Sequence, residues 1–391
     1  MKTILIILSL VVLGLHIAGC DKRGNQAQTD VIKIGVVAEL TGDIPAVGVS
    51  CKNAAEMAVK AVNDAGGIDV AGKKYKVQLF MEDNAARADQ SASAVQKLIE
   101  QRGVVAIIGP NASTGAIPAS EIAEASKVTL ITPWSTNPKT TLDSRTGKHK
   151  RYVFRACYLD TFQGQVLASF ARDGLKAKTA AVLFDVAAEA LKGQAEVFKG
   201  TFEQKGGRVT AYETYSTGDR DFSAQLTKIR RETPDVLFLP AYYSDVPLVV
   251  QQAHRLGLSM PFLGSDAWAS SELTKLCASD CDGYFFSSHY LSESTSEVSQ
   301  RFVKAYSELY KQPPDDVAAL TYDAFGVLFQ ALGKVQKVDT ESVRNALAAT
   351  TQYAGVTGNI KYVEGSGDPI KGAVILQIKD GKFQWHSQAN P

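Results

Sequence analysis

Short apolar runs alternate with amphipathic helical stretches along this chain, and this alternation most restricts the fold it can adopt. A strand is expected at residues 31–40, and the helical pattern that follows it stops at Gly66-Gly67. The same succession of strand and helix recurs up to residue 131. Parallel strands need a crossover between them, usually a helix, so the pattern predicts an α/β fold with a helix-covered parallel sheet.

A polar stretch at residues 137–150 interrupts this rhythm, and a second series of strands and helices then runs from residue 152 to residue 263. Longer helical patterns follow at 298–310 and 317–335, and a closing set of strands ends the chain. We therefore predict two α/β lobes, each with a doubly wound, mainly parallel sheet.

The first residues predict export. A basic start at Met1-Lys2 and an apolar run at 3–15 are typical of a secretory signal peptide, here residues 1–19. Ile17-Ala18-Gly19-Cys20 resembles the lipobox of bacterial lipoproteins, which implies cleavage before Cys20 and lipidation of its thiol. The polar residues 20–30 are expected to be a tether to the membrane of the cell envelope. Asp21, directly after the cysteine, resembles an inner-membrane retention signal of some Gram-negative bacteria, which implies the periplasmic side of the inner membrane. The alternative is an uncleaved signal anchor.

Charge and composition exclude several classes of protein. A net charge of +1 argues against a nucleic-acid-binding protein, which needs a clustered basic surface. No spacing typical of a zinc site or a phosphate-binding loop occurs, so neither a metal nor another cofactor is expected. The histidines form no catalytic motif, and we expect no enzyme; they are His16, His149, His254, His289 and His386. Cys277 and Cys281 could form a disulfide, although cysteines four apart on a regular helix are poorly placed for one.

Ligands of open parallel sheets bind beyond the carboxyl ends of the strands, so the loops after the strands are the candidate site. Ser113 follows the strand at 104–108 and begins a helix, where an anion is favoured; the alternative is an ordinary helix cap. Trp134, in a proline-bracketed loop after the strand at 128–131, is either a pocket wall or a packing aromatic. In the second series, Glu189, Tyr242 and Asp266 occupy equivalent loops, and Asp266 could pair with a cation or could be a turn residue.

Runs of sequence along nearly the whole chain resemble the type I periplasmic binding proteins of the branched-chain amino acid (leucine/isoleucine/valine) family, the receptors of ABC importers. That resemblance implies two lobes joined by a three-segment hinge, namely residues 31–158 plus 285–356 and residues 159–284 plus 357–391. The runs that carry the resemblance are Ile32-Lys33-Ile34-Gly35-Val36, Asp64-Ala65-Gly66-Gly67-Ile68, Ile107-Ile108-Gly109-Pro110, Thr136-Asn137-Pro138, Phe154-Arg155, Asp221-Phe222-Ser223-Ala224, Pro234-Asp235-Val236 and Gly355-Val356-Thr357-Gly358.

The resemblance also implies roles for residues. Ser113, Thr136 and the amides around Trp134 and Ser135 would bind the α-carboxylate and part of the α-ammonium of an amino acid. Asp266 would pair with the α-ammonium, and Tyr242 would close over the ligand. These positions favour an amino acid over a sugar or an inorganic ion.

The chain departs from the family where the ligand side chain is contacted. Glu189 replaces a usual aromatic, and Val47 and Val317 replace larger residues. We therefore expect a wider or more acidic pocket, for a larger neutral amino acid or one with a positive group. The expected partners are an amino acid and ABC permease subunits, with the protein a monomer; a signalling receptor or a binder of a related small amide or amine is the alternative.

Overall fold

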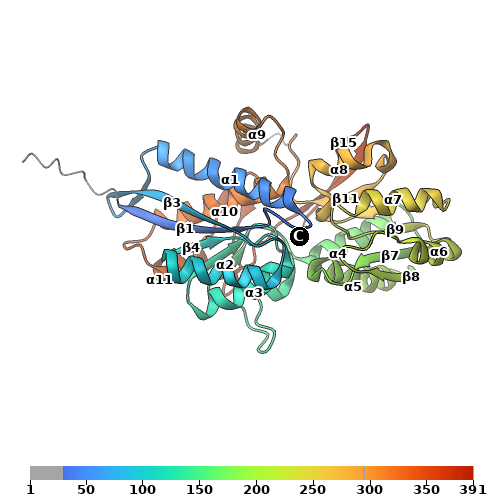
Figure 1. Ribbon diagram of the computed structural model, residues 1–391, viewed down its shortest axis with the longest axis horizontal. Helices are drawn as coiled ribbons and strands as arrows, with labels where there is room; N and C mark the ends of the chain where they lie inside the picture. Colours follow the sequence, from blue (N-terminus) through green and yellow to red (C-terminus); the bar gives the residue numbers. More distant parts are fainter. Residues whose placement is uncertain (1–29, 294–295, 391) are drawn as a thin grey trace, which may run out of the picture.

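The computed structural model describes residues 30–293 and 296–390. The predicted signal peptide, the lipidated Cys20 and the tether up to residue 29 lie outside these residues. The described chain forms two α/β lobes arranged end to end along the long axis of the molecule (Figure 1). The prediction of a two-lobed α/β fold is confirmed.

The sheet of the first lobe has the strand order β2-β3-β1-β4-β5-β6. Its strands run parallel except that β2 and β3 form an antiparallel pair. All residues of β4 and β5 are buried, as expected for central strands covered on both faces. The strands are β1 (Val31–Ala38), β2 (Ile68–Val70), β3 (Lys73–Asp83), β4 (Ala106–Ile108), β5 (Thr129–Thr132) and β6 (Val153–Arg155).

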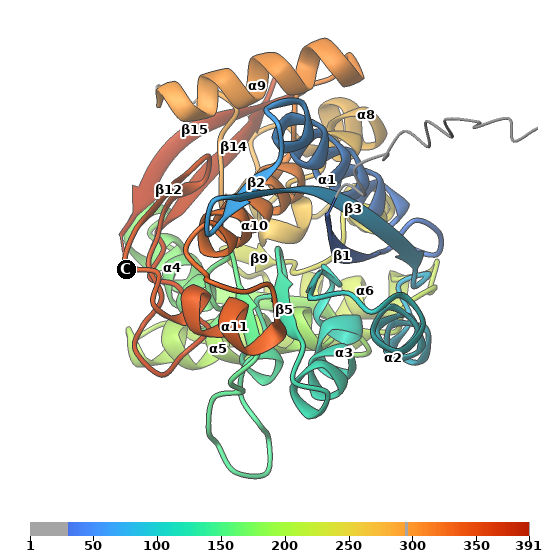
Figure 2. The same cartoon turned by 90° about the vertical axis from the view of Figure 1, so that its left-hand side faces the viewer.

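Helices cover both faces of this sheet. Helix α1 packs beside α10 on one face, and α2 packs beside α3 on the other (Figure 2). Pro45 is accommodated in the first turn of α1, where no backbone donor is needed, and the Asp315 side chain caps α10 by accepting from the amide of Ala318 at 2.9 Å. The helices are α1 (Pro45–Asp64), α2 (Ala88–Lys97), α3 (Ser113–Ala125), α9 (Glu297–Tyr310), α10 (Asp316–Leu332) and α11 (Thr340–Ala348).

The sheet of the second lobe has the order β15-β14-β11-β10-β9-β7-β8. The strands from β11 to β8 are parallel, whereas β14 and β15 extend the sheet with antiparallel pairings. The sheet is therefore mixed rather than wholly parallel. Its strands are β7 (Thr179–Asp185), β8 (Arg208–Tyr215), β9 (Val236–Phe238), β10 (Phe262–Gly264), β11 (Phe285–Ser288), β14 (Ala373–Lys379) and β15 (Lys382–Ala389), with helices α4 (Asp160–Ser169), α5 (Glu189–Gln204), α6 (Ser223–Glu232), α7 (Val246–Arg255) and α8 (Ser271–Cys277).

The described chain crosses between the two sheets three times. The crossings follow β6, β11 and the short hairpin of β12 (Tyr353–Gly355) and β13 (Gly358–Ile360). Because β11 pairs with β10, residues 285–288 belong to the second sheet, and the predicted lobe boundary at residue 285 needs to move beyond Ser288. We propose lobe boundaries that follow these three crossings.

Cys277 and Cys281 are joined by a disulfide, with their Cα atoms 5.7 Å apart. Helix α8 ends at Cys277, and Ala278 has a φ of 46°, so the two cysteines do not lie on one continuous helix. This break removes the geometric objection to the bond. Cys51 and Cys157 are buried, and neither forms a disulfide with another residue that the structure describes.

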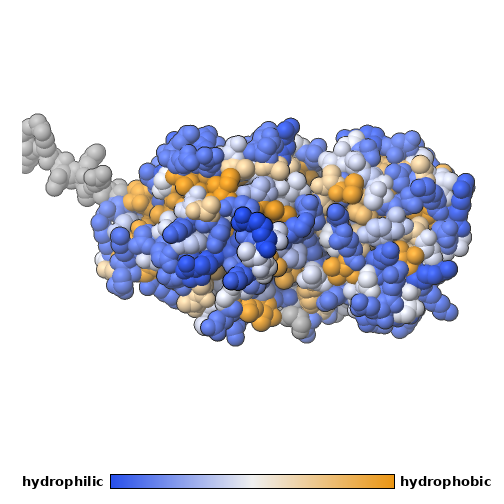
Figure 3. Space-filling view, turned by 90° about the horizontal axis from the view of Figure 1, so that it is seen from below, coloured by the Kyte–Doolittle hydropathy of each residue, from blue (hydrophilic) through white to orange (hydrophobic). Residues whose placement is uncertain are grey.

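The surface of the molecule is mostly hydrophilic on the side seen in Figure 3, where apolar residues form small separate patches. None of the helices in the described part of the chain is long and apolar enough to cross a membrane.

Candidate functional site

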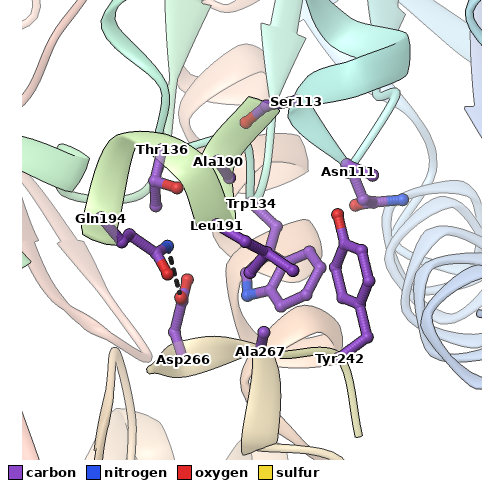
Figure 4. A pocket seen from close by; sticks show the side chains of 11 residues that line it. Asn111, Ser113, Trp134, Thr136, Ala190, Leu191, Gln194, Tyr242, Asp266 and Ala267 are labelled. Carbon is purple, nitrogen blue, oxygen red and sulfur yellow. Dashed lines mark hydrogen bonds between the residues drawn. The ribbon is translucent and has the colours of Figure 1, made fainter. Parts of the chain in front are cut away.

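A small cavity lies between the two lobes, at the carboxyl ends of the central strands (Figure 4). The first lobe contributes the loops after β4 and β5, and the second contributes the loops after β9 and β10 with the start of α5. This position agrees with the general rule for ligands of open α/β sheets. The lining residues are Asn111, Ala112, Ser113, Trp134, Thr136, Ala190, Leu191, Gln194, Tyr242, Asp266 and Ala267.

The loop after β4 is fixed by a close backbone approach and by a buried carboxylate. Gly109 has a φ of 88°, and a Cβ there would lie 2.1 Å from the carbonyl oxygen of Val37. Glu39 Oε1 accepts from the amides of Asn111 and Ala112, at 3.0 and 3.1 Å, and Glu39 Oε2 accepts from the Asn111 side chain at 2.8 Å. Burial raises the pKa of Glu39, while these hydrogen bonds oppose the rise. The loop therefore places Ser113, the first residue of α3, at the cavity.

Ser113 is oriented by its neighbours. Its Oγ lies 2.9 Å from Ser135 Oγ and accepts from the amide of Asn137 at 3.3 Å. The first amides of a helix have no acceptor within the helix, and their partial positive charge favours an anion. The Ser113 end of the cavity thus suits a carboxylate.

The loop after β5 is held by Arg155, a fully buried residue at the end of β6. The Arg155 guanidinium donates to the carbonyl oxygens of Ser135 and Asn137, which flank Thr136, and it pairs with Asp368 at 2.6 Å. These bonds fix the backbone on both sides of Thr136, which lines the cavity.

Trp134 and Tyr242 form a wall to which each lobe contributes one ring. Their ring centroids are 6.3 Å apart, with the planes inclined at 39°. The indole N–H of Trp134 donates to Asp316 Oδ2 at 3.3 Å, which fixes the orientation of the ring. Burial and the nearby Asp315 raise the pKa of Asp316 well above its ordinary value.

Asp266 lies on a short turn after β10 that is built around a buried tryptophan. The Trp268 indole donates to the carbonyl oxygen of Leu239 at 3.0 Å, and a Cβ at Gly264 would lie 2.2 Å from the Trp268 ring. Only glycine leaves room for this ring at position 264. The turn places Asp266, which is 2% exposed, at the cavity.

Three side chains donate to the Asp266 carboxylate. Oδ1 accepts from the Nε2 atoms of Gln163 and Gln194, at 2.8 and 3.3 Å, and Oδ2 lies 3.0 Å from His289 Nε2. Burial lowers the pKa of His289, which favours the neutral ring, and a neutral ring that donates to a carboxylate carries its proton on Nε2. Oδ2 has one donor and can accept a further bond, so Asp266 remains available to a cationic group in the cavity.

Asp160, at the start of α4, lies behind this cluster and accepts from Gln194 Nε2 at 2.9 Å. Burial raises the pKa of Asp160 to about 7, while hydrogen bonds from Thr136 and Gln194 oppose the rise. The folded protein therefore binds this proton more tightly than the unfolded chain does. Stability from this source is present at acid pH and is lost as the pH rises toward 7.

We expect the unfolding free energy of the ligand-free protein to fall by about 2 kcal/mol between about pH 5.5 and 7.5, because Asp160 loses its proton over this interval. Asp160→Asn removes this titration, so the stability of the variant relative to the wild type should rise by that amount over the same interval. Urea unfolding at both pH values measures the difference. A stability difference that does not change with pH would contradict the prediction.

The two lobes touch each other around the cavity. The amide of Ala46 donates to Tyr243 Oη at 3.2 Å. The Asn137 side chain donates to the carbonyl oxygen of Glu189 at 2.9 Å, and Lys139 Nζ pairs with Glu189 Oε2 at 2.9 Å. The lobes are therefore joined by two separate sets of rim contacts, Ala46 with Tyr243, and Asn137 and Lys139 with Glu189.

The structure brings together five of the residues predicted from sequence, which are Ser113, Trp134, Thr136, Tyr242 and Asp266. Ser135 is buried behind Ser113 and supports it, rather than lining the cavity. The Glu189 carboxylate faces Lys139 outside the cavity, and the pocket is not made more acidic by it. Val47 and Val317 lie in the core of the first lobe and do not widen the cavity.

Sequence reasoning missed Asn111, Leu191 and Gln194. Gln194 is 1% exposed on the buried face of α5, and a polar residue on an otherwise apolar helical stripe is the signal that could have identified it. Among the described residues, no group of three or more histidine, cysteine, aspartate or glutamate side chains could bind a metal ion.

Two α/β lobes with a cavity between them, lined by polar and apolar side chains from both, define a two-lobed ligand-binding protein. The chain belongs to the periplasmic binding protein family, whose sequence profile matches residues 31–382. The resemblance noted in the sequence is thereby confirmed at the level of the family.

Known relatives extend over most of the chain. A Leu/Ile/Val-binding protein of Rhizobium johnstonii is 30% identical over 86% of this chain and 88% of its own length. A leucine-, isoleucine-, valine-, threonine- and alanine-binding protein of Pseudomonas aeruginosa is 27% identical over 98% of this chain and 96% of its own. The crystal structure of a leucine-binding protein from Thermotoga maritima is similar, with a TM-score of 0.85, 32% identity, and coverage of 92% of this chain and 99% of that one.

Proposed function

We propose that this protein binds a free amino acid between its lobes and delivers it to an ABC importer. The observation that carries the proposal is the placement of Asp266 and Ser113 across one buried cavity (Figure 4). Asp266 offers a carboxylate to an α-ammonium, and the start of α3 offers a hydroxyl and helix amides to an α-carboxylate. The relatives named as amino-acid-binding proteins support the same assignment.

The charge of the cavity lining agrees with such a ligand. Among the described residues that line the cavity, none is lysine or arginine, so the ligand carboxylate must be met by neutral donors. The chain acts by binding, and we assign it no catalytic step.

A screen of the twenty amino acids with purified protein, freed of bound ligand by unfolding and refolding, tests this function. An amino acid at about 100 times its Kd should raise the unfolding free energy by about 2.7 kcal/mol, which a thermal shift detects. Glu189→Gln is the control, because its carboxylate lies outside the cavity and its loss should leave the ranking of ligands unchanged. If none of the amino acids shifts the melting temperature, the proposal fails.

We also propose that lipidated Cys20 anchors a monomer on the extracytoplasmic face of the membrane. The lipobox-like sequence before Cys20 supports the anchor, and membership of the periplasmic binding protein family supports the location. The wild-type protein should fractionate with membranes and a Cys20→Ser variant should not. Recovery of wild-type protein in the soluble fraction would contradict the anchor.

A further inference from the structure

Two buried side-chain oxygen atoms of the cavity lining have no hydrogen-bond donor within the described part of the chain. They are Asn111 Oδ1 and Gln194 Oε1, and both side chains are at most 1% exposed. Buried acceptors in native proteins are almost always paired, with protein, water or ligand. A ligand in this cavity is therefore expected to carry donors for both atoms.

The partners of each amide nitrogen fix which atom of the amide is left free. Gln194 Nε2 donates to the carboxylates of Asp160 and Asp266, which leaves Oε1 as the free atom. Asn111 Nδ2 donates to Glu39 Oε2, and Glu39 Oε1 already accepts two backbone amides. Because Glu39 acts as an acceptor for all these donors, the free atom of Asn111 is Oδ1.

The two free oxygens lie at different ends of the cavity. Gln194 lies beside Asp266, whereas Asn111 lies on the opposite side, next to the hydroxyl end of Tyr242 (Figure 4). An α-ammonium paired with Asp266 can also donate to Gln194. Asn111 Oδ1 is then left to the side chain of the amino acid, which extends past Trp134 toward Tyr242.

We propose that the bound amino acid has a hydroxyl or carboxamide side chain whose N–H or O–H donates to Asn111 Oδ1. The inference rests on the proposed function and narrows its substrate class. Branched-chain side chains offer no donor, and they would leave a buried acceptor unpaired. A neutral group is favoured over a cation because Glu39, the carboxylate nearest to Asn111, is already engaged by N–H donors and does not line the cavity.

Calorimetric titration with isosteric ligands tests this inference. Threonine differs from valine, and asparagine from leucine, mainly in replacing apolar groups with hydrogen-bonding ones. We expect the polar member of at least one pair to bind roughly tenfold more tightly or better. Equal or tighter binding of valine and leucine overturns the inference while the proposed function stands. Tighter binding of 2,4-diaminobutyrate than of asparagine overturns the choice of a neutral side chain, and no binding by any of these ligands overturns the proposed function as well.

An Asn111→Leu variant separates recognition from structural damage. Loss of Oδ1 should abolish or reverse the polar preference within each pair, whereas general damage to the site would weaken both members equally. Asn84→Leu is the matched control, because Asn84 Nδ2 also donates to Glu39, at 3.4 Å, but Asn84 does not line the cavity. The preference should persist in this control. The wild-type titrations decide the question even if neither variant folds.

Discussion

Asp266→Ala is expected to weaken binding of the amino acid by about 2 to 5 kcal/mol. The carboxylate of Asp266 is buried, and the substitution would leave the ligand ammonium in the cavity without its charged partner. It would also free the donors of Gln163, Gln194 and His289, which now converge on the two carboxylate oxygens. Isothermal titration calorimetry with the best ligand of the amino-acid screen measures the loss.

A matched variant distinguishes lost recognition from lost stability. Asp185 is also a buried carboxylate in the second lobe, but it bonds to Thr217 and the amide of Ala187 and does not line the cavity. Asp185→Ala should therefore destabilise the fold and leave the affinity nearly unchanged. If Asp266→Ala binds the ligand as tightly as the wild type does, the assignment of Asp266 to the ammonium is wrong.

Asp368→Ala is expected to lower the unfolding free energy by about 3 to 5 kcal/mol, because it leaves the buried guanidinium of Arg155 without its ionic partner. Arg155→Ala should lower the unfolding free energy by a similar amount, since it leaves Asp368 and the carbonyl oxygens of Ser135 and Asn137 without their donor. Attraction by Arg155 lowers the pKa of Asp368 despite the opposing effect of burial. Urea denaturation measures both losses.

The exposed pair of Arg301 and Glu297 is the control for this prediction. Both side chains are more than 60% exposed, and breaking the pair should change stability by less than about 1 kcal/mol. The double variant Arg155→Ala with Asp368→Ala should be more stable than the sum of the two single losses predicts, because neither charge remains buried alone. Additive losses would show that the pair does not act as a unit.

Periodicity predicted most strands and helices in their order, but not the short strands β2 and β12 or the short helix α8. The amphipathic pattern at residues 189–204 coincides with α5, and the apolar run at 236–239 contains β9. The pairing of strands was harder to predict, because it depends on contacts between distant residues. β14 and β15 were expected as a closing meander, but only the pairing of β14 with β11 shows that they extend the second sheet.

Residues that line the cavity were predictable where they lie in a loop directly after a strand. Ser113 and Asp266 were found in this way, since the carboxyl ends of parallel strands meet at one edge. Gln194 enters from the side of a helix, so its place in the chain relative to a strand gave no signal. Glu189 begins the same helix, but its carboxylate points at Lys139, and only side-chain geometry reveals that direction.

The rim contacts between the lobes have a kinetic consequence. Tyr243 contacts Ala46 and Asn137 contacts Glu189 across the two lobes, and Asp266 at the cavity is almost completely shielded from solvent. We expect a ligand bound beside Asp266 to leave when the lobes separate, so its residence time depends on the rate of lobe separation as well as on its own bonds. Weakening a rim bond should therefore shorten the lifetime of the complex, even with every ligand contact intact.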